Sequence, residues 1–273
     1  MNNKTAFASS RRAGVVLCIP LIAGVLVFYA IPMAMLLWQS LRTPGGSFCG
    51  LQNYKALLCN PAFQLAAQNT AVLWAVSLPV DLGIGMLFAQ LWNLCSSGIG
   101  LCWLMFPAMV PAACSIAFGK LAFFCIFGAN EIAQAHLFSF IVFLYLWKTV
   151  GFTALVLHQK IRSIPLELSE TAADLGAAPL QIFFKIQLPI LIPAIADSLA
   201  IALLGSFRLF REAYLLAGPH PQGRLYSLQH FYYNNFANLN APRLAAASIL
   251  QTVMIALFAA LLFRRDPKHE TQK

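Results

Sequence analysis

Six long apolar runs dominate the sequence and limit what the chain can fold into. They lie near residues 15–41, 66–91, 99–127, 137–157, 188–216 and 244–263. One membrane-spanning helix needs roughly 20 mostly apolar residues. Only 10% of the 273 residues are charged, whereas a soluble domain carries about 25%. The runs therefore predict an all-α membrane protein in which residues 1–273 form one domain of six spans.

Basic residues set the predicted orientation, because Lys and Arg gather in the cytoplasmic segments of membrane proteins. With the N-terminus inside, the cytoplasmic segments hold Lys4, Arg11, Arg12, Lys160, Arg162, Lys185, Arg264, Arg265, Lys268 and Lys273. The opposite side holds Arg42, Lys55, Arg224 and Arg243, plus Arg208 and Arg211 if these lie beyond the bilayer. This bias predicts that both termini are cytoplasmic. It also accounts for much of the net charge of +9 without a nucleic-acid partner.

The cytoplasmic segment at residues 159–187 is longer than a connection between two spans requires. Pro165 suits the first turn of a helix, and Glu167 and Glu170 lie near its positive N-terminal end. Gly176 suits the left-handed residue that ends such a helix. Pro179 then opens a second short helix. The pattern predicts a helix–turn–helix that lies at the cytoplasmic face and offers a docking surface.

The same segment reads IPLELSETAADLGAAPLQIFFKIQLP and resembles the "EAA" signature of importer permeases of the ATP-binding-cassette superfamily. That signature is Glu-Ala-Ala, three residues, Gly, nine residues, Ile, one residue and Leu-Pro. Thr171 is the single departure. The resemblance implies a coupling helix that seats in a cleft of an ATPase subunit. The predicted docking residues are Glu170, Ala172, Ala173, Gly176, Ile186, Leu188 and Pro189.

The resemblance extends from about Arg11 to Arg265. The stretches GLQNYKALLCNPAFQLAAQNT, FPAMVPAACSIAF and LWKTVGF resemble those of carbohydrate-uptake permeases of the maltose and glycerol-phosphate type, in the same order. The type I importer fold is implied, with a coupling helix between spans 4 and 5. The implied location is the bacterial inner membrane. The implied partners are membrane lipid, a second related permease, two ATPase subunits and an extracytoplasmic solute-binding protein.

The function implied is that of a permease subunit in an ATP-driven importer for a sugar or a sugar-like solute. The chain has no GxxxxGK[ST] phosphate loop, so ATP and Mg belong to the partner ATPases and this chain holds no cofactor of its own. The alternatives are the same architecture importing a phosphorylated polyol, a polyamine or another small solute. A more distant alternative is a membrane-embedded enzyme. For the docking segment, the alternative is an amphipathic helix resting on lipid.

Charged residues within the apolar runs are candidates for the substrate pathway, because charge at membrane depth usually faces a cavity or a partner. They are Lys148, Arg208, Arg211 and Glu212. Arg208 and Glu212 have the i,i+4 spacing of an ion pair on one helix face. Arg211 stands where the resembled permeases tend to carry an acidic residue. Arg211 suggests either an anionic cargo or binding to an acidic patch of the binding protein. The alternative is that Arg208 and Arg211 lie above the bilayer and are solvated.

Other candidate chemistry in the sequence is weak. No histidine pair has the spacing of metal ligands, and we expect no metal site. Cys49 and Cys59 lie in the first polar loop and are either a disulfide, if that loop is external, or free thiols.

Overall fold

The computed structural model describes residues 18–94, 99–128, 132 and 136–263. Within them the chain is helical, with one isolated β-bridge between Arg42 and Phe48. The prediction of an all-α protein is confirmed. The helices are α2 (Ile31–Ser40), α3 (Gln52–Leu58), α4 (Pro61–Leu94), α5 (Ile99–Met109), α6 (Ala112–Phe127), α7 (Leu137–Arg162), α8 (Leu166–Asp174), α9 (Pro179–Ile182), α10 (Leu188–Arg208), α11 (Phe210–Ala217), α12 (Leu228–Ala237) and α13 (Ala241–Phe263). Short π-helical or 3₁₀ turns are η1 (Leu26–Ala30), η3 (Phe183–Gln187) and η4 (Gly223–Leu225).

Five helical stretches in the described residues are long and apolar enough to cross a membrane. They are Cys18–Ser40, Pro61–Asn93, Leu137–Arg162, Pro179–Ala217 and Ala241–Leu262. A sixth span is counted if the bent pair of α5 and α6 is taken as one. The stretch Pro179–Ala217 begins earlier than the fifth expected span, 188–216, because the helical path from α9 through η3 into α10 is unbroken. Residues 15–17 of the first expected span lie outside the described residues.

The span expected over 99–127 is not a straight helix in the described residues. The described part of this range forms α5 and α6, which are bent by 118°. The bend falls at Val110 and Pro111, where Pro111 has the extended ψ of 151° and caps α6. Proline has no backbone N–H to donate, and it disfavours the helical conformation of the residue before it. Hydropathy gives no information on direction, so a bend inside an apolar run is invisible to it.

The chain divides into two compact units, one of which contains the described part of residues 1–60 together with Asn235–Met254. In this unit the turn between α2 and α3 is closed by polar side chains. The Ser40 and Tyr54 hydroxyls lie 2.8 Å apart, and Asn53 Nδ2 donates to the carbonyl oxygens of Ser40 and Arg42. Cys49 and Cys59 are free thiols, which resolves the alternative left open by the sequence.

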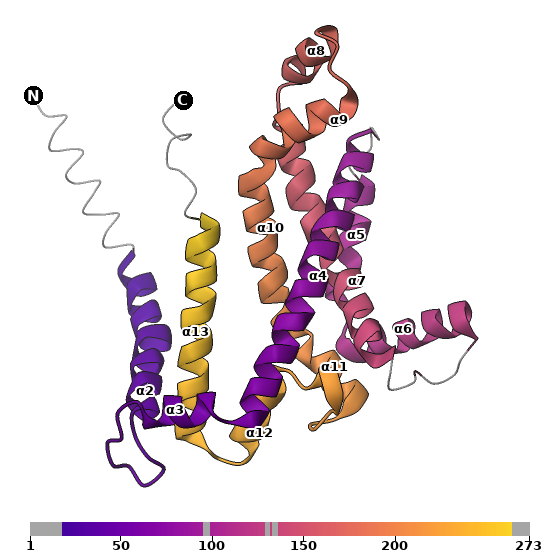
Figure 1. Cartoon of the computed structure of the whole chain (residues 1–273). Helices are drawn as coiled ribbons and strands as arrows, with labels where there is room; N and C mark the ends of the chain where they lie inside the picture. The colour runs from indigo at the N-terminus through magenta and orange to yellow at the C-terminus, as the bar shows by residue number, and fades with distance from the viewer. Residues whose placement is uncertain (1–17, 95–98, 129–131, 133–135, 264–273) are drawn as a thin grey trace, which may run out of the picture. The chain divides into compact units, whose positions relative to one another are not determined.

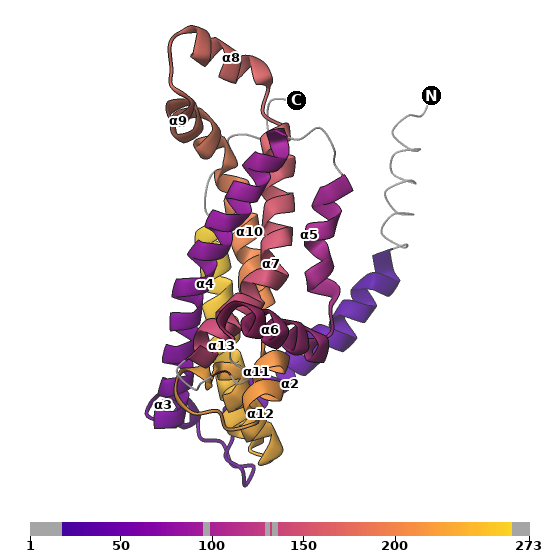
Figure 2. The same cartoon turned by 90° about the vertical axis from the view of Figure 1, so that its right-hand side faces the viewer.

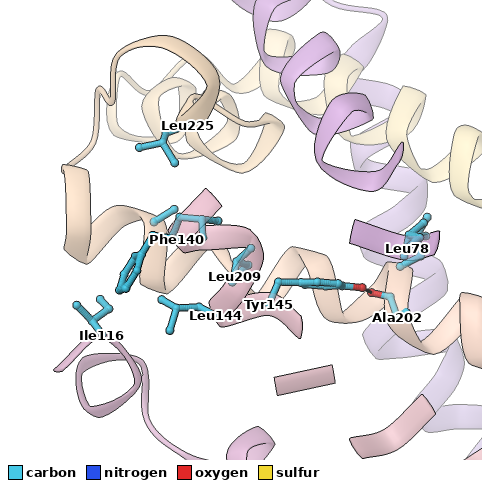
Figure 3. Close-up of a cluster of buried hydrophobic side chains, with 11 residues drawn as sticks. Leu78, Ile116, Phe140, Leu144, Tyr145, Ala202, Leu209 and Leu225 are labelled. Carbon is cyan, nitrogen blue, oxygen red and sulfur yellow. Dashed lines mark hydrogen bonds between the residues drawn. The ribbon is translucent and has the colours of Figure 1, made fainter. Parts of the chain in front are cut away.

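The second unit contains Pro61–Asn234 and the described part of residues 255–273, and its core forms around α7, which packs against α4, α10 and α5. Figures 1 and 2 show α8 and α9 beyond one end of α7 and α10, while α6 and α11 lie toward the other end. One apolar cluster includes Leu78, Ile116, Phe140 and Leu144 (Figure 3). A second cluster, around Leu157 and Leu191, lies nearer to α8 along α7 and α10. Buried apolar side chains therefore pack along α7 and α10, from the end near α8 and α9 toward α11.

Glycine allows the closest approach in this packed unit. A Cβ added to Gly151 of α7 would lie 1.9 Å from the backbone oxygen of Leu104 in α5. Backbone cannot move aside as a flexible side chain does, so any other residue would push the two helices apart. Close packing of α7 against α5 thus explains why the LWKTVGF stretch has a glycine at position 151, which was not evident from the sequence.

Candidate transport cavity and docking segment

Residues 166–182, which form α8, a turn and α9, are called the docking segment here. Gly176 ends α8 with a φ of +85°. Its N–H donates to Ala173 O at 2.8 Å, and the N–H of Ala177 donates to Ala172 O at 3.0 Å. These two bonds form the glycine-based Schellman ending of a helix. The predicted helix–turn–helix is confirmed, since Pro165 caps α8 and Pro179 opens α9.

The surface of the docking segment is unusual for a connection of this size. No residue of α8 is buried, and Leu166, Leu175 and Leu180 are 73%, 84% and 71% exposed. The segment also carries three acidic residues, Glu167, Glu170 and Asp174, and no lysine or arginine. An apolar and acidic surface differs from a lipid-surface helix, whose polar face is rich in Lys and Arg. The surface suits a protein partner with an apolar groove and basic side chains.

The predicted docking residues fall into two groups in the structure. Glu170, Ala172, Ala173 and Gly176 belong to the docking segment, where all but the half-buried Ala172 are exposed. Ile186 lies in η3, and Leu188 and Pro189 begin α10. The side chain of Gln187 between them accepts a hydrogen bond from Gln90 Nε2 of α4 at 3.1 Å. The motif thus joins an exposed helix to the helix that enters the core.

A cavity of about 670 Å³ lies in the same unit. Its wall comes from five helices: the bend between α5 and α6, the middle of α7, the end of α10 and the start of α11. The residues of the wall include all four charged residues predicted for the substrate pathway, namely Lys148, Arg208, Arg211 and Glu212. Its volume falls within the range of about 300–1,000 Å³ of small-molecule sites. Residues that are 64 positions apart in the sequence are therefore brought to one cavity.

Glu212 forms an ion pair with Lys148, between α11 and α7. The two side chains are only 4% and 18% exposed. Glu212 therefore pairs with a residue of another helix, and not with Arg208, although the i,i+4 spacing would allow that pair on one helix face. A lysine on the facing helix reaches Oε1, and the other carboxylate oxygen, Oε2, is buried with no hydrogen-bond partner in the described part of the chain.

Arg208 and Arg211 differ from Lys148 in having no ion pair among the residues that the structure describes. Both are exposed and both line the cavity. With Lys148 balanced by Glu212, the charged residues of the wall leave two uncompensated positive charges. The cavity is therefore a cationic site formed by two guanidinium groups.

A polar cluster formed by Asp81, Thr149 and Thr153 lies beside this cavity and was not identified from the sequence. Asp81 of α4 is 1% exposed. Its two oxygens accept hydrogen bonds from the hydroxyls of Thr149, at 2.6 Å, and Thr153, at 2.5 Å. Both threonines belong to the cavity wall. A lone aspartate in an apolar run and two threonines with i,i+4 spacing were the available signals.

Tyr145 and Trp74 form further hydrogen bonds, which connect α7 and α4 to α10. The Tyr145 hydroxyl of α7 donates to Ala202 O of α10 at 2.8 Å (Figure 3). Trp74 Nε1 of α4 donates to Ser206 Oγ of α10 at 2.8 Å. Buried polar groups with satisfied partners fix the relative positions of the helices that carry them. The side of the cavity formed by α7 and α10 is thereby held in register.

Comparison with known proteins agrees with this arrangement. A family model described as "Binding-protein-dependent transport system inner membrane component" matches residues 78–267. The trehalose/maltose transport system permease protein MalF of Thermococcus litoralis is 29% identical, over 97% of this chain and 99% of that protein. The arabinooligosaccharides transport system permease protein AraP of Bacillus subtilis is 28% identical, over 94% and 88%.

A solved structure shares the fold. The crystal structure of a bacterial ABC transporter involved in the import of the acidic polysaccharide alginate matches with a TM-score of 0.75 and 20% sequence identity, over 95% of this chain and 97% of that chain. The family model covers more than half of the sequence, including the whole cavity wall and the docking segment. This chain belongs to the family of inner membrane components of binding-protein-dependent transport systems.

Proposed function

We propose that the chain is the permease subunit of an ATP-driven importer that carries a sugar or a sugar-like solute. The observation that carries the proposal is the presence, in one packed unit, of an exposed docking segment and a cavity of small-molecule size. Relatives named for trehalose and maltose, for multiple sugars and for arabinooligosaccharides support the solute class. The family is one of transport components rather than enzymes.

The proposed mechanism uses α7 and α10 as the mechanical connection. Lys148 precedes Arg162, the last residue of α7, by 14 positions, which is about 21 Å at a rise of about 1.5 Å per residue. An ATPase that moves the docking segment would displace the ends of both helices. Because the same helices line the cavity, the displacement would alternate its access between the two sides of the membrane.

The proposed assembly pairs the chain with a second, related permease and two ATPase subunits, which hold ATP and Mg. A solute-binding protein would deliver cargo from outside. A related solved structure shows the alginate transporter with a periplasmic protein bound to an alginate pentasaccharide, which supports that partner. We place both termini and the docking segment in the cytoplasm, from the charge bias of the connecting segments. The α11 end of the unit then faces outward, where the binding protein docks.

Among the alternative solutes, the cavity disfavours a polyamine and is compatible with a phosphorylated polyol. Its wall holds three cationic side chains and one anionic side chain. A polycation would meet repulsion from Arg208 and Arg211, while an anionic solute would meet attraction.

The docking role is tested by Glu170→Lys and Gly176→Asp, with Gln52→Lys on α3 as the control for an added surface lysine. We expect both docking variants to insert and fold, to lose the ATPase subunit on purification and to lose sugar uptake. Gln52→Lys should retain both. If the two docking variants retain the ATPase and the uptake of wild type, the docking proposal is wrong.

A further inference from the structure

Two guanidinium groups, those of Arg208 and Arg211, line the same cavity. Arg208 ends α10 and Arg211 lies three residues later in α11. Side chains three residues apart on a helical path lie on the same face, about 5–6 Å apart at their Cβ atoms. Both belong to the wall of the same cavity. Both arginines therefore belong to one side of the cavity wall.

Neither of the two carboxylates near the cavity forms an ion pair with the arginines. Glu212, the acidic residue of the wall, is paired with Lys148. Asp81 lies behind the wall, and both of its oxygens accept threonine hydroxyls. The described part of the chain thus supplies no counter-ion to Arg208 or Arg211. Their charge is available to a ligand.

The rest of the wall suits the body of a sugar. Phe152 is half-buried and contributes an aromatic side chain to the wall. Thr149 is half-buried, and its hydroxyl remains able to accept a hydrogen bond while it donates to Asp81. The wall therefore combines apolar side chains, a hydroxyl acceptor and a cationic pair.

We propose that the cavity recognises cargo that carries a carboxylate or phosphate group, which Arg208 and Arg211 bind through their guanidinium forks. The proposal rests on the proposed function, because it assigns the solute class of that same cavity. A guanidinium presents paired N–H donors that match the oxygens of a carboxylate or a phosphate. The Lys148–Glu212 ion pair holds α7 and α11 together beside this site and keeps Glu212 from neutralising the arginines.

The test measures ligand binding to the importer complex, purified with its partner subunits in phosphatidylcholine nanodiscs without the binding protein. The probes are digalacturonate and its dimethyl ester, which have the same ring skeleton and differ in charge. We expect wild type to bind digalacturonate at least about tenfold more tightly than the ester, as for a charged hydrogen-bonding group. The preference should weaken as salt is raised.

Variants at the arginines give the second part of the test. Arg208→Gln and Arg211→Gln should each reduce digalacturonate affinity about tenfold or more and leave the affinity for the ester nearly unchanged. Arg211→Lys should retain more affinity than Arg211→Gln, because it keeps the charge and loses the fork. Arg243→Gln, at an arginine of α13 that does not line the cavity, should behave as wild type.

Three results would overturn the inference. The first is equal affinity of wild type for digalacturonate and its ester. The second is unchanged ligand binding in the arginine variants together with lost stimulation of ATP hydrolysis by the binding protein, which would assign the arginines to that partner. The third is an anion preference that is present in phosphatidylcholine nanodiscs and absent in phosphatidylglycerol nanodiscs, which would assign the arginines to anionic lipid headgroups. If the complex assembles and imports neutral sugars in any of these cases, the permease function stands while the anionic cargo is rejected.

Discussion

The packed helices α4, α7 and α10 and the docking segment use their polar and apolar residues in opposite ways. Between the packed helices, Asp81 bonds to Thr149 and Thr153, and Tyr145 bonds to the carbonyl of Ala202. In the docking segment, α8 buries no residue and Leu175 is 84% exposed. The first region is determined by contacts within the chain. The second presents the side chains that a partner would have to bury.

This difference explains which parts of the molecule the sequence could predict. The docking segment depends on local rules, because Pro165, Gly176 and Pro179 set helix ends through their own backbone preferences. Those ends were predicted and are present. The partner of Glu212 depends on packing between helices that are distant in sequence. Local spacing favoured Arg208, but the tertiary fold places Lys148 against the carboxylate.

The largest effect should come from breaking a pair inside the packed region. Lys148→Ala leaves Glu212 buried without its counter-ion, and removal of one partner of a buried pair costs about 3–5 kcal/mol. We expect a large drop in the thermal unfolding midpoint of the purified chain. The double variant Lys148→Ala with Glu212→Leu removes both charges and should recover most of the loss. An unfolding midpoint of Lys148→Ala equal to that of wild type would show that the ion pair does not stabilise the unit.

A smaller, pH-dependent effect should come from His230 of α12, which is outside the candidate spans. Burial, followed by the nearby His220, lowers the pKa of His230 to about 4 from its ordinary 6.5. In the unfolded chain His230 is protonated below about pH 6.5, whereas in the folded chain it stays neutral down to about pH 4. Its contribution to stability is therefore complete above pH 6.5 and is lost as the pH falls toward 4.

The variant His230→Asn isolates this contribution, since other titrating groups are unchanged. We expect the unfolding midpoint of wild type to fall more steeply than that of His230→Asn between pH 7 and pH 4.5. Parallel curves for the two proteins would rule out a buried neutral histidine.

The smallest effect on stability should come from the docking segment, which sharpens the contrast. Leu175→Asp replaces an exposed leucine, so the free energy of unfolding of the isolated chain should change by less than about 0.5 kcal/mol. The same variant should weaken binding of the ATPase subunit, because the apolar side chain of Leu175 is replaced by a charged one. A strong loss of stability with the ATPase still bound would place Leu175 in the chain's own core.

The most direct test of the central claim, that α8 is the site of coupling to a partner, is a crosslink from Ala173. Ala173→Cys is introduced into a chain without its native cysteines, and the intact complex is treated with a short thiol-reactive crosslinker. Leu51→Cys, at a residue 71% exposed before α3, is the control on the side that we place outside. We predict a crosslink from Ala173→Cys to an ATP-binding subunit, and none from Leu51→Cys. A complex that hydrolyses ATP and imports solute, but forms no crosslink at Ala173→Cys, would contradict the account.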